Sequence, residues 1–263
     1  MFSAGSRTVD HTTPIKERWG GWYVTGTHGK QSHVGNLIVR TKRVPEPVDN
    51  SQGHNVLDLQ ERFNVDRYIS PHSDIVALMV MEHQTMVHNC LTKANFATRQ
   101  ALHYEKTMNG ILDYGEDNRL ESTNRRIANA GDDLIEAILM VDEAPLTSSV
   151  KGTSGYADVF AGNGKRDSQG RSLRDLDLSR RMFRYPCSYM IYSDSFNELP
   201  GPMYDYVWQQ LGRILSGEDQ SDKFAHLSRS DRRAIAEILR ATKPGLPAQW
   251  ATNSGVNVSL AAP

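Results

Sequence analysis

The strongest pattern of apolar positions lies between residues 73 and 108, where they repeat with the period of an α-helix. At about 100° per residue, one row falls within about 60° of a single direction. It comprises Val76, Val80, Val87, Cys90, Ala94, Ala97 and Ala101. A second row of Leu78, Met81 and Leu91 lies on the opposite side. Because a helix that is apolar on two sides is usually covered on both, the pattern predicts a long central helix.

Four shorter segments also show helical signals, over 116–143, 179–196, 202–216 and 228–242. Ser228 and Asp231 form an N-terminal cap signature for the last of these, and Lys243-Pro244-Gly245 ends it. Pro145 closes the first. Residues 146–172 are rich in glycine and read as loop.

The chain before residue 72 has a different character. Residues 1–71 read as irregular structure punctuated by glycine, with short strands expected at 22–25 and 36–41 and a polar connector over 43–66. The predicted fold is mainly α, with a long central helix and a small irregular, β-containing N-terminal part. A single domain is expected over 1–250, divided into a loop and short-strand subregion (1–71) and a helical region (72–250). The tail, 251–263, is expected to be disordered.

Composition narrows the classes of function. The chain has 263 residues, with 30 Lys+Arg against 31 Asp+Glu and a net charge of -1. This balance gives no electrostatic case for nucleic-acid binding. No apolar run approaches the ~20 residues of a spanning helix, so no membrane span is expected. Two cysteines, Cys90 and Cys187, exclude a disulfide-rich scaffold, and whether they pair stays open.

Several motifs of known chemistry fail on spacing. Gly29-Lys30 lacks the earlier glycine and the following Ser or Thr of a phosphate-binding loop, since Val24 and Gln31 stand there. Ser148 and Lys151 have the spacing of an acyl-enzyme pair but lie in a loop-like segment without its companion motif. Cys-x-x-Cys-His is absent, so the chain offers no covalent haem attachment of its own.

Histidines are the first candidate for chemistry. His83 lies near the centre of the apolar row, and His72 begins the same row three turns earlier. A buried imidazole needs a hydrogen bond, a metal or a cofactor. His83 is therefore either a hydrogen-bonded core histidine or a ligand to a metal or haem iron. His88 lies about 140° from His83 at 100° per residue, so Glu82, His83 and His88 form no simple chelate.

Two further segments suggest ligand contacts. Residues 17–29 combine Trp19, Trp22 and His28 with four glycines, and they contact either a flat cofactor or another layer of protein. Residues 165–184 hold seven Lys/Arg against three Asp, and Arg171 and Arg174 are candidates to hold phosphates or haem propionates. Local Asp–Arg pairing on the surface is the alternative for this segment.

Three stretches carry a family resemblance: ERWGGWYVTGTHG (17–29), SDIVALMVMEHQ (73–84) and GRSLRDLDLSRRMFRYPCSYMIYS (170–193). Together they resemble the C-terminal portion of a family of bacterial c-type-cytochrome-like proteins. The resemblance implies an exported, periplasmic or otherwise extracytoplasmic helical domain that packs around haem, with a His or Met as distal ligand. The family's haem-attachment motif is missing here. The opening residues also show no signal-peptide pattern. The missing motif points to a truncated member or one that has lost haem, and the missing signal peptide to a cytoplasmic protein, a mature form or a fragment.

The leading hypothesis is therefore a haem-associated redox or electron-transfer domain that works with a redox partner protein. Its candidate haem-iron ligand is His83, with His28 and His72 as reserves, Trp19 and Trp22 as haem contacts, and Arg171 and Arg174 as propionate partners. A non-catalytic helical scaffold or interaction domain is the first alternative. A metal-dependent enzyme using His and carboxylate ligands is the second, so whether the protein is an enzyme stays open.

Overall fold

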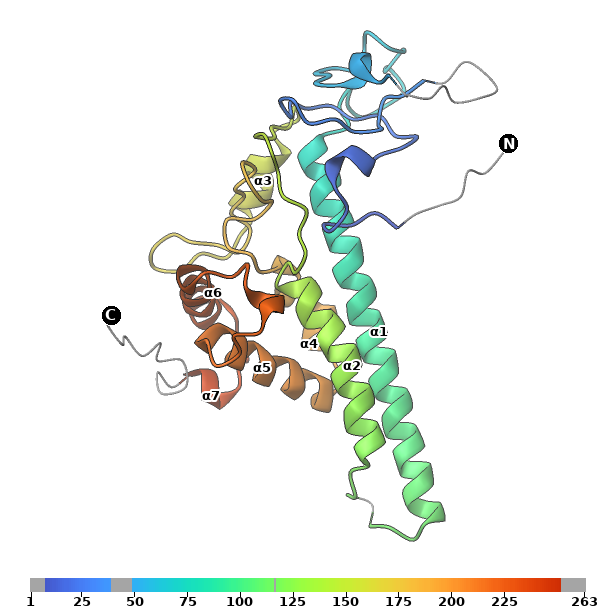
Figure 1. The fold of residues 1–263 in the computed structure, drawn as a ribbon, viewed down its shortest axis with the longest axis vertical. Helices are drawn as coiled ribbons and strands as arrows, with labels where there is room; N and C mark the ends of the chain where they lie inside the picture. The colour runs from blue at the N-terminus through green and yellow to red at the C-terminus, as the bar shows by residue number, and fades with distance from the viewer. Residues whose placement is uncertain (1–7, 39–48, 116, 252–263) are drawn as a thin grey trace. The chain divides into compact units, whose positions relative to one another are not determined.

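The computed structural model describes residues 8–38, 49–115 and 117–251 (Figure 1). They form two compact units, each built from segments far apart in the sequence. Unit 1 comprises Met1–His83, Asp142–Gly164 and Arg174–Arg184. Unit 2 comprises Gln84–Val141, Lys165–Leu173 and Tyr185–Pro263. The expectation of a single domain over 1–250 stays a prediction.

The long helix α1 (Ile75–Ile111) confirms the strongest sequence pattern. Asp74 begins it by accepting hydrogen bonds from the main-chain N–H groups of Val76 (2.8 Å) and Ala77 (3.2 Å). Most of the predicted apolar row is buried, with Val76, Val80, Val87, Ala94 and Ala101 at most 1% exposed. The second row is buried at Leu78 and Leu91 and exposed at Met81.

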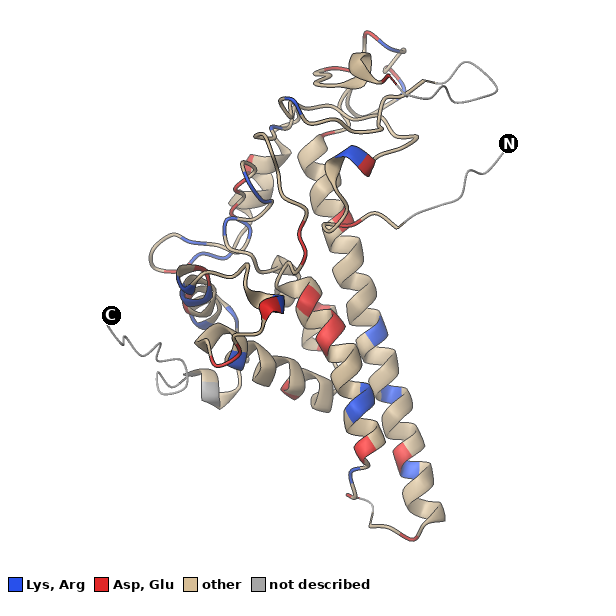
Figure 2. Ribbon diagram, viewed as in Figure 1, with Lys and Arg blue, Asp and Glu red and all other residues tan. Residues whose placement is uncertain are grey.

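Unit 2 is built from helices packed around tryptophan. α2 (Glu121–Ile138) lies beside the second half of α1 and is joined to it by the Lys93–Asp133 ion pair, and Arg119, two residues before α2, pairs with Glu105 of α1. α4 (Asp194–Asn197), α5 (Gly201–Ser216), α6 (Arg229–Thr242) and α7 (Ala248–Ala251) follow. The fully buried ring of Trp208 meets that of Trp250 at 5.0 Å between centroids. Figure 2 shows basic and acidic residues interspersed along α1 and α2.

The helix predicted over 116–143 is shorter than expected. α2 ends at Ile138 because the backbone then turns into the left-handed region at Met140 (φ 58°) and Asp142 (φ 57°). The helices predicted over 202–216 and 228–242 are confirmed by α5 and α6. In α6, Ser228 and Asp231 form the reciprocal capping box that the sequence indicated.

The helix predicted over 179–196 is wrong. That segment is irregular and contains only a 3₁₀-helix (Tyr189–Tyr192) and the start of the four-residue α4. Pro186 removes a backbone donor in its middle, and Leu178 enters it with a positive φ of 58°. Conversely, a helix was missed: α3 (Tyr156–Gly162) lies inside the stretch predicted as loop.

The N-terminal part of unit 1 is irregular, but the β-structure predicted for it is not found. Within the described residues there are only isolated bridges, Thr25–Asp74, Thr27–Lys151 and Leu176–Phe183. The strand predicted at 22–25 is therefore wrong: positive φ at Gly21 (82°) and Gly26 (150°) interrupts any regular ladder on both sides.

Other predictions fall partly on residues that the structure does not describe. Of the strand predicted at 36–41, Asn36 has a left-handed φ of 62°, and residues 39–41 lie outside the described part of the chain. So does the first part of the connector, 43–48; the rest holds one short 3₁₀-helix (Ser51–Gly53). The predicted tail lies outside it from residue 252. Among the described helices, none is long and apolar enough to cross a bilayer.

Candidate functional site

His83 is fully buried in unit 1, as its place in the apolar row predicted. Its Nδ1 lies 3.2 Å from Nδ1 of His11, and its ring meets the edge of Phe183 at 5.4 Å between centroids. Burial, and then the neighbouring His11, lower the pKa of His83 well below its ordinary value. The residue is thus a neutral imidazole paired with a second imidazole, and its Nδ1 is occupied.

Charged groups accompany this pair inside unit 1. Arg18 is buried and donates to Glu82 (Nη1 to Oε2, 3.1 Å) and to the main-chain oxygens of Thr13 and His11. Burial raises the pKa of Glu82 to about 7, against the lowering effect of Arg18. Glu82 is therefore bound to arginine, not to a histidine, and His88 is exposed. The arrangement that a Glu82–His83–His88 metal site needs is not assembled.

A second group of histidines gathers in the glycine-rich N-terminal segment. The ring centroids of His28 and His33 lie 4.7 Å apart, those of His33 and His54 5.3 Å, and those of His28 and His54 5.6 Å. His28 and His33 are buried, and His54 is half-buried. Trp19, itself buried, packs its ring against His33 at 5.4 Å. We call His28, His33 and His54 the histidine cluster.

Backbone N–H groups determine which ring nitrogens of the cluster carry protons. Asn55 donates its N–H to Nε2 of His28 (3.0 Å), and Gly35 donates its N–H to Nδ1 of His33 (3.0 Å). Those two nitrogens are acceptors, so in the neutral rings the proton lies on Nδ1 of His28 and on Nε2 of His33. Nδ1 of His28 is buried and has no hydrogen-bond partner. Burial, with the neighbouring His28 and His54, lowers the pKa of His33 to about 4.

Aromatic side chains stay exposed close to the start of α1. Tyr23 packs against Phe63 at 4.7 Å between ring centroids, and Phe63 meets Tyr68 at 5.7 Å. The Tyr68 side chain is 64% exposed. Trp22, which precedes Tyr23 in the chain, is 59% exposed. We call Tyr23, Phe63 and Tyr68 the aromatic surface. The two candidate tryptophans thus differ, since Trp19 is core and Trp22 is accessible.

His72 is held beside the segments that carry the aromatic surface. On one side, Leu59 donates its N–H to the carbonyl of Pro71 (3.1 Å); on the other, Thr25 donates its N–H to the carbonyl of Ser73 (2.7 Å). The His72 side chain is half-buried. Its Nδ1 is buried without a hydrogen-bond partner. Among the candidate histidines, His72 is the one whose ring nitrogens make no hydrogen bond to another described residue.

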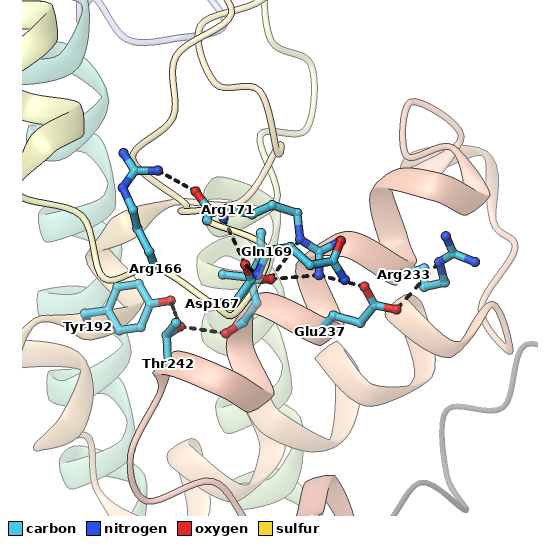
Figure 3. A network of polar contacts seen from close by, with 10 residues as sticks. Arg166, Asp167, Gln169, Arg171, Tyr192, Arg233, Glu237 and Thr242 are labelled. Atoms are coloured by element: carbon cyan, nitrogen blue, oxygen red, sulfur yellow. Dashed lines mark hydrogen bonds and ion pairs between the residues drawn. The ribbon is translucent and has the colours of Figure 1, made fainter.

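Arg171, in the basic segment 165–184, belongs to unit 2 and is half-buried. Figure 3 shows its guanidinium between Asp167 and Glu237, at 2.7 Å from each carboxylate. Asp167 also accepts the main-chain N–H of Arg171 (2.9 Å). The charge of Arg171 is already balanced within the protein, and a propionate would have to displace two carboxylates. In unit 1, Arg174 lies over the ring of Phe160 at 4.9 Å.

The candidate histidines differ in how well they fit haem or another metal. No group of three or more His, Cys, Asp or Glu side chains in the described part is arranged to hold a metal ion. His83 does not fit haem iron, because its ring is enclosed by His11 and Phe183. His28 does not fit either, because its lone pair accepts the Asn55 N–H. His72 fits better, since neither ring nitrogen is hydrogen-bonded to another described residue; because its Nδ1 is buried, Nε2 would have to bind the iron.

Four residues were not predicted from the sequence: His11 as the partner of His83, His33 and His54 as members of the histidine cluster, and Glu143, whose carboxylate accepts the main-chain N–H of Met182. His11 and His54 lie in irregular segments with no periodic pattern to place them. One signal was present: three histidines among glycines and asparagines over 28–55, residue types that turn the chain back on itself.

In comparisons with known proteins, no family model, no curated protein and no solved structure matches this chain.

Proposed function

We propose that the protein is a haem-associated electron-transfer domain that binds haem at the aromatic surface beside His72. The observation that carries the proposal is the combination of exposed aromatic rings with a half-buried histidine whose ring is unbonded. Flat, largely apolar faces associate with aromatic rings, and imidazole is a common axial ligand of haem iron. The resemblance to c-type-cytochrome-like proteins supports the same function and an extracytoplasmic location.

Hydrogen bonds of neighbouring residues fix the position of His72. Thr25 donates to Ser73 O (2.7 Å) and accepts from the N–H groups of Ile75 (2.8 Å, main-chain oxygen) and Ser73 (3.0 Å, hydroxyl). These bonds fasten Ser73, which follows His72, and Ile75, which begins α1, to Thr25. The histidine is therefore held on a rigid support. When bound, haem supplies an iron centre that changes by one electron. Trp22 and Tyr23 would cover its face, and His72 would hold the iron.

A hemin titration followed by absorption spectroscopy tests the proposal. We expect a saturable Soret shift, with sharp bands after reduction. His72→Ala should weaken hemin binding at least about tenfold, because a ligand bond is lost. Trp22→Ala should weaken it less. His88→Ala, which removes an exposed histidine from α1, is the matched control and should leave the titration unchanged. No Soret shift, or the same shift in His72→Ala, would contradict the assignment.

A second candidate is a non-catalytic interaction domain, favoured by the same exposed aromatic rings. Exposed apolar patches of this kind also mark protein-binding surfaces. For such a domain we expect a featureless hemin titration and a thermal melt that hemin does not shift. A hemin-dependent rise in melting temperature that His72→Ala abolishes would instead favour the haem domain.

A further inference from the structure

The histidine cluster places three imidazole rings in mutual contact, among side chains that are mostly uncharged. Trp19, Gln31, Asn50 and Asn55 surround it with uncharged groups. Among the described residues, exposed Asp49 is the charged side chain that acts on the cluster, through His54. Positive charge on two adjacent rings would therefore meet little compensation.

Ring nitrogens of the cluster also hold two backbone groups: Nε2 of His28 joins the segments around residues 28 and 55, and Nδ1 of His33 closes a local turn to Gly35. His28 and Asn55 are joined twice, because His28 N–H donates to the Asn55 side-chain oxygen (2.7 Å) and Asn55 N–H donates to Nε2 of His28 (3.0 Å). Gly35 N–H donates to Nδ1 of His33 (3.0 Å). In both rings, the nitrogen that accepts the backbone N–H is the nitrogen that a second proton must occupy.

Protonation is thus coupled to the backbone. An imidazolium ion donates from both nitrogens and accepts from neither. When His28 and His33 take up a proton, the N–H groups of Asn55 and Gly35 lose their acceptors and face N–H donors. The new charges on neighbouring rings repel one another as well. Both effects favour opening of the loops that contain Gly35 and Asn55.

We propose that the histidine cluster is an acid-sensitive latch, closed by two backbone-to-imidazole hydrogen bonds and opened when His28 and His33 each bind a second proton. The step moves two protons from solvent to ring nitrogens and breaks two N–H···N bonds. The low pKa of His33, about 4, agrees with a latch that stays closed at neutral pH. A metal-binding role is disfavoured, because a metal would need the same lone pairs.

Hydrogen exchange of single amides, combined with a histidine-resolved NMR titration between pH 7 and pH 3, tests the latch. After correction for intrinsic exchange, we expect the Asn55 and Gly35 amides to lose protection at the pH where the two rings titrate. The loss should approach about tenfold per pH unit for each proton taken up. The Thr27 amide, which donates to the carbonyl of Lys151 (2.9 Å), is the internal control and should stay protected. Protected Asn55 and Gly35 amides at a pH where both rings are protonated would overturn the proposal.

A variant gives an independent test. The double substitution His28→Gln and His33→Gln keeps an oxygen acceptor at each position but removes the titrating ring. We expect it to abolish the acid-dependent loss of protection, whereas His88→Gln should leave that loss unchanged. The same midpoint in the folded double variant would overturn the latch. If the double variant does not fold, the coincidence of ring titration and amide exchange in the unaltered chain decides the question.

Discussion

Burial determines the protonation of Glu143, a residue of unit 1. Its carboxylate accepts the main-chain N–H of Met182 (2.6 Å). Burial is the largest effect on it, opposed by Met182 and Arg181, and raises its pKa to about 7 from an ordinary 4.5. The folded state therefore keeps a proton on Glu143 over a pH range in which the unfolded chain has released it.

The raised pKa of Glu143 fixes the direction in which pH changes the stability. A raised carboxyl pKa contributes stability that is present below pH 4.5 and lost as the pH rises to about 7. Glu143→Gln removes the titration but keeps an acceptor for Met182. We expect urea denaturation to show a gain of about 1–3 kcal/mol at pH 8 and almost none at pH 4. Glu61→Gln, an exposed control, should change neither value. An equal effect of Glu143→Gln at both pH values would contradict this account.

The burial of His83 could be predicted from the sequence, but its hydrogen-bond partner could not. Its burial followed from the helical period alone, since Val80 and Val87 flank it on the same row. Its partner could not be inferred, because His11 lies 72 positions away in an irregular segment. The pairing meets the need of a buried imidazole for a hydrogen bond, so no iron is required to explain His83.

At the scale of elements, two glycines have opposite roles. Gly110 lies within the last turn of α1, where an added Cβ would meet nothing within 4 Å. Gly217 ends α5 in the left-handed conformation, with φ 82°. Helical backbone favours alanine over glycine, whereas positive φ penalises any Cβ.

The same substitution should therefore change stability in opposite directions. We expect Gly110→Ala to raise the free energy of unfolding by up to about 1 kcal/mol. Gly217→Ala should lower it by about 1 kcal/mol. Thermal denaturation of the two variants beside the unaltered chain measures both. Two changes of the same sign would show that the conformation of one glycine is misassigned.

At the scale of the whole molecule, Asp74 joins parts of unit 1 that are far apart in the sequence. One carboxylate oxygen accepts the N–H groups that begin α1. The other accepts the N–H groups of Thr153 (2.8 Å) and Ser154 (2.9 Å) and the Ser154 hydroxyl (2.8 Å). Gly152 approaches so closely that a Cβ there would lie 2.3 Å from Asp74 Oδ2.

Replacing this carboxylate should weaken unit 1 as a whole. Asp74→Asn retains only one acceptor oxygen, so the donors on the other side lose their partner. We expect a loss of about 2–4 kcal/mol in the free energy of unfolding. Asp158→Asn, at an exposed position in α3, is the matched control and should cost less than about 0.5 kcal/mol. A chemical-denaturation series on both variants measures the difference in the free energy of unfolding. Equal losses would show that Asp74 does not hold these segments together.

The sequence by itself determined the elements whose signals are local. α1 follows from a helical row of apolar residues and α6 from the Ser228 and Asp231 cap, and α5 matches the helix expected over 202–216. The failures have local causes too, since Pro186 outweighed the apolar residues around it. In the N-terminal segment, positive φ at Gly21 and Gly26 left the strand expected at 22–25 as a single bridge at Thr25.

Only the tertiary structure decided which side chains meet. His11 with His83, the three rings of the histidine cluster, and Arg171 with Glu237 join residues between 5 and 72 positions apart, mostly through irregular loops. Their contacts depend on how loops close, and loop closure leaves no period in the sequence. The free ring of His72 and the occupied rings of His28 and His83 appear only once those contacts are known.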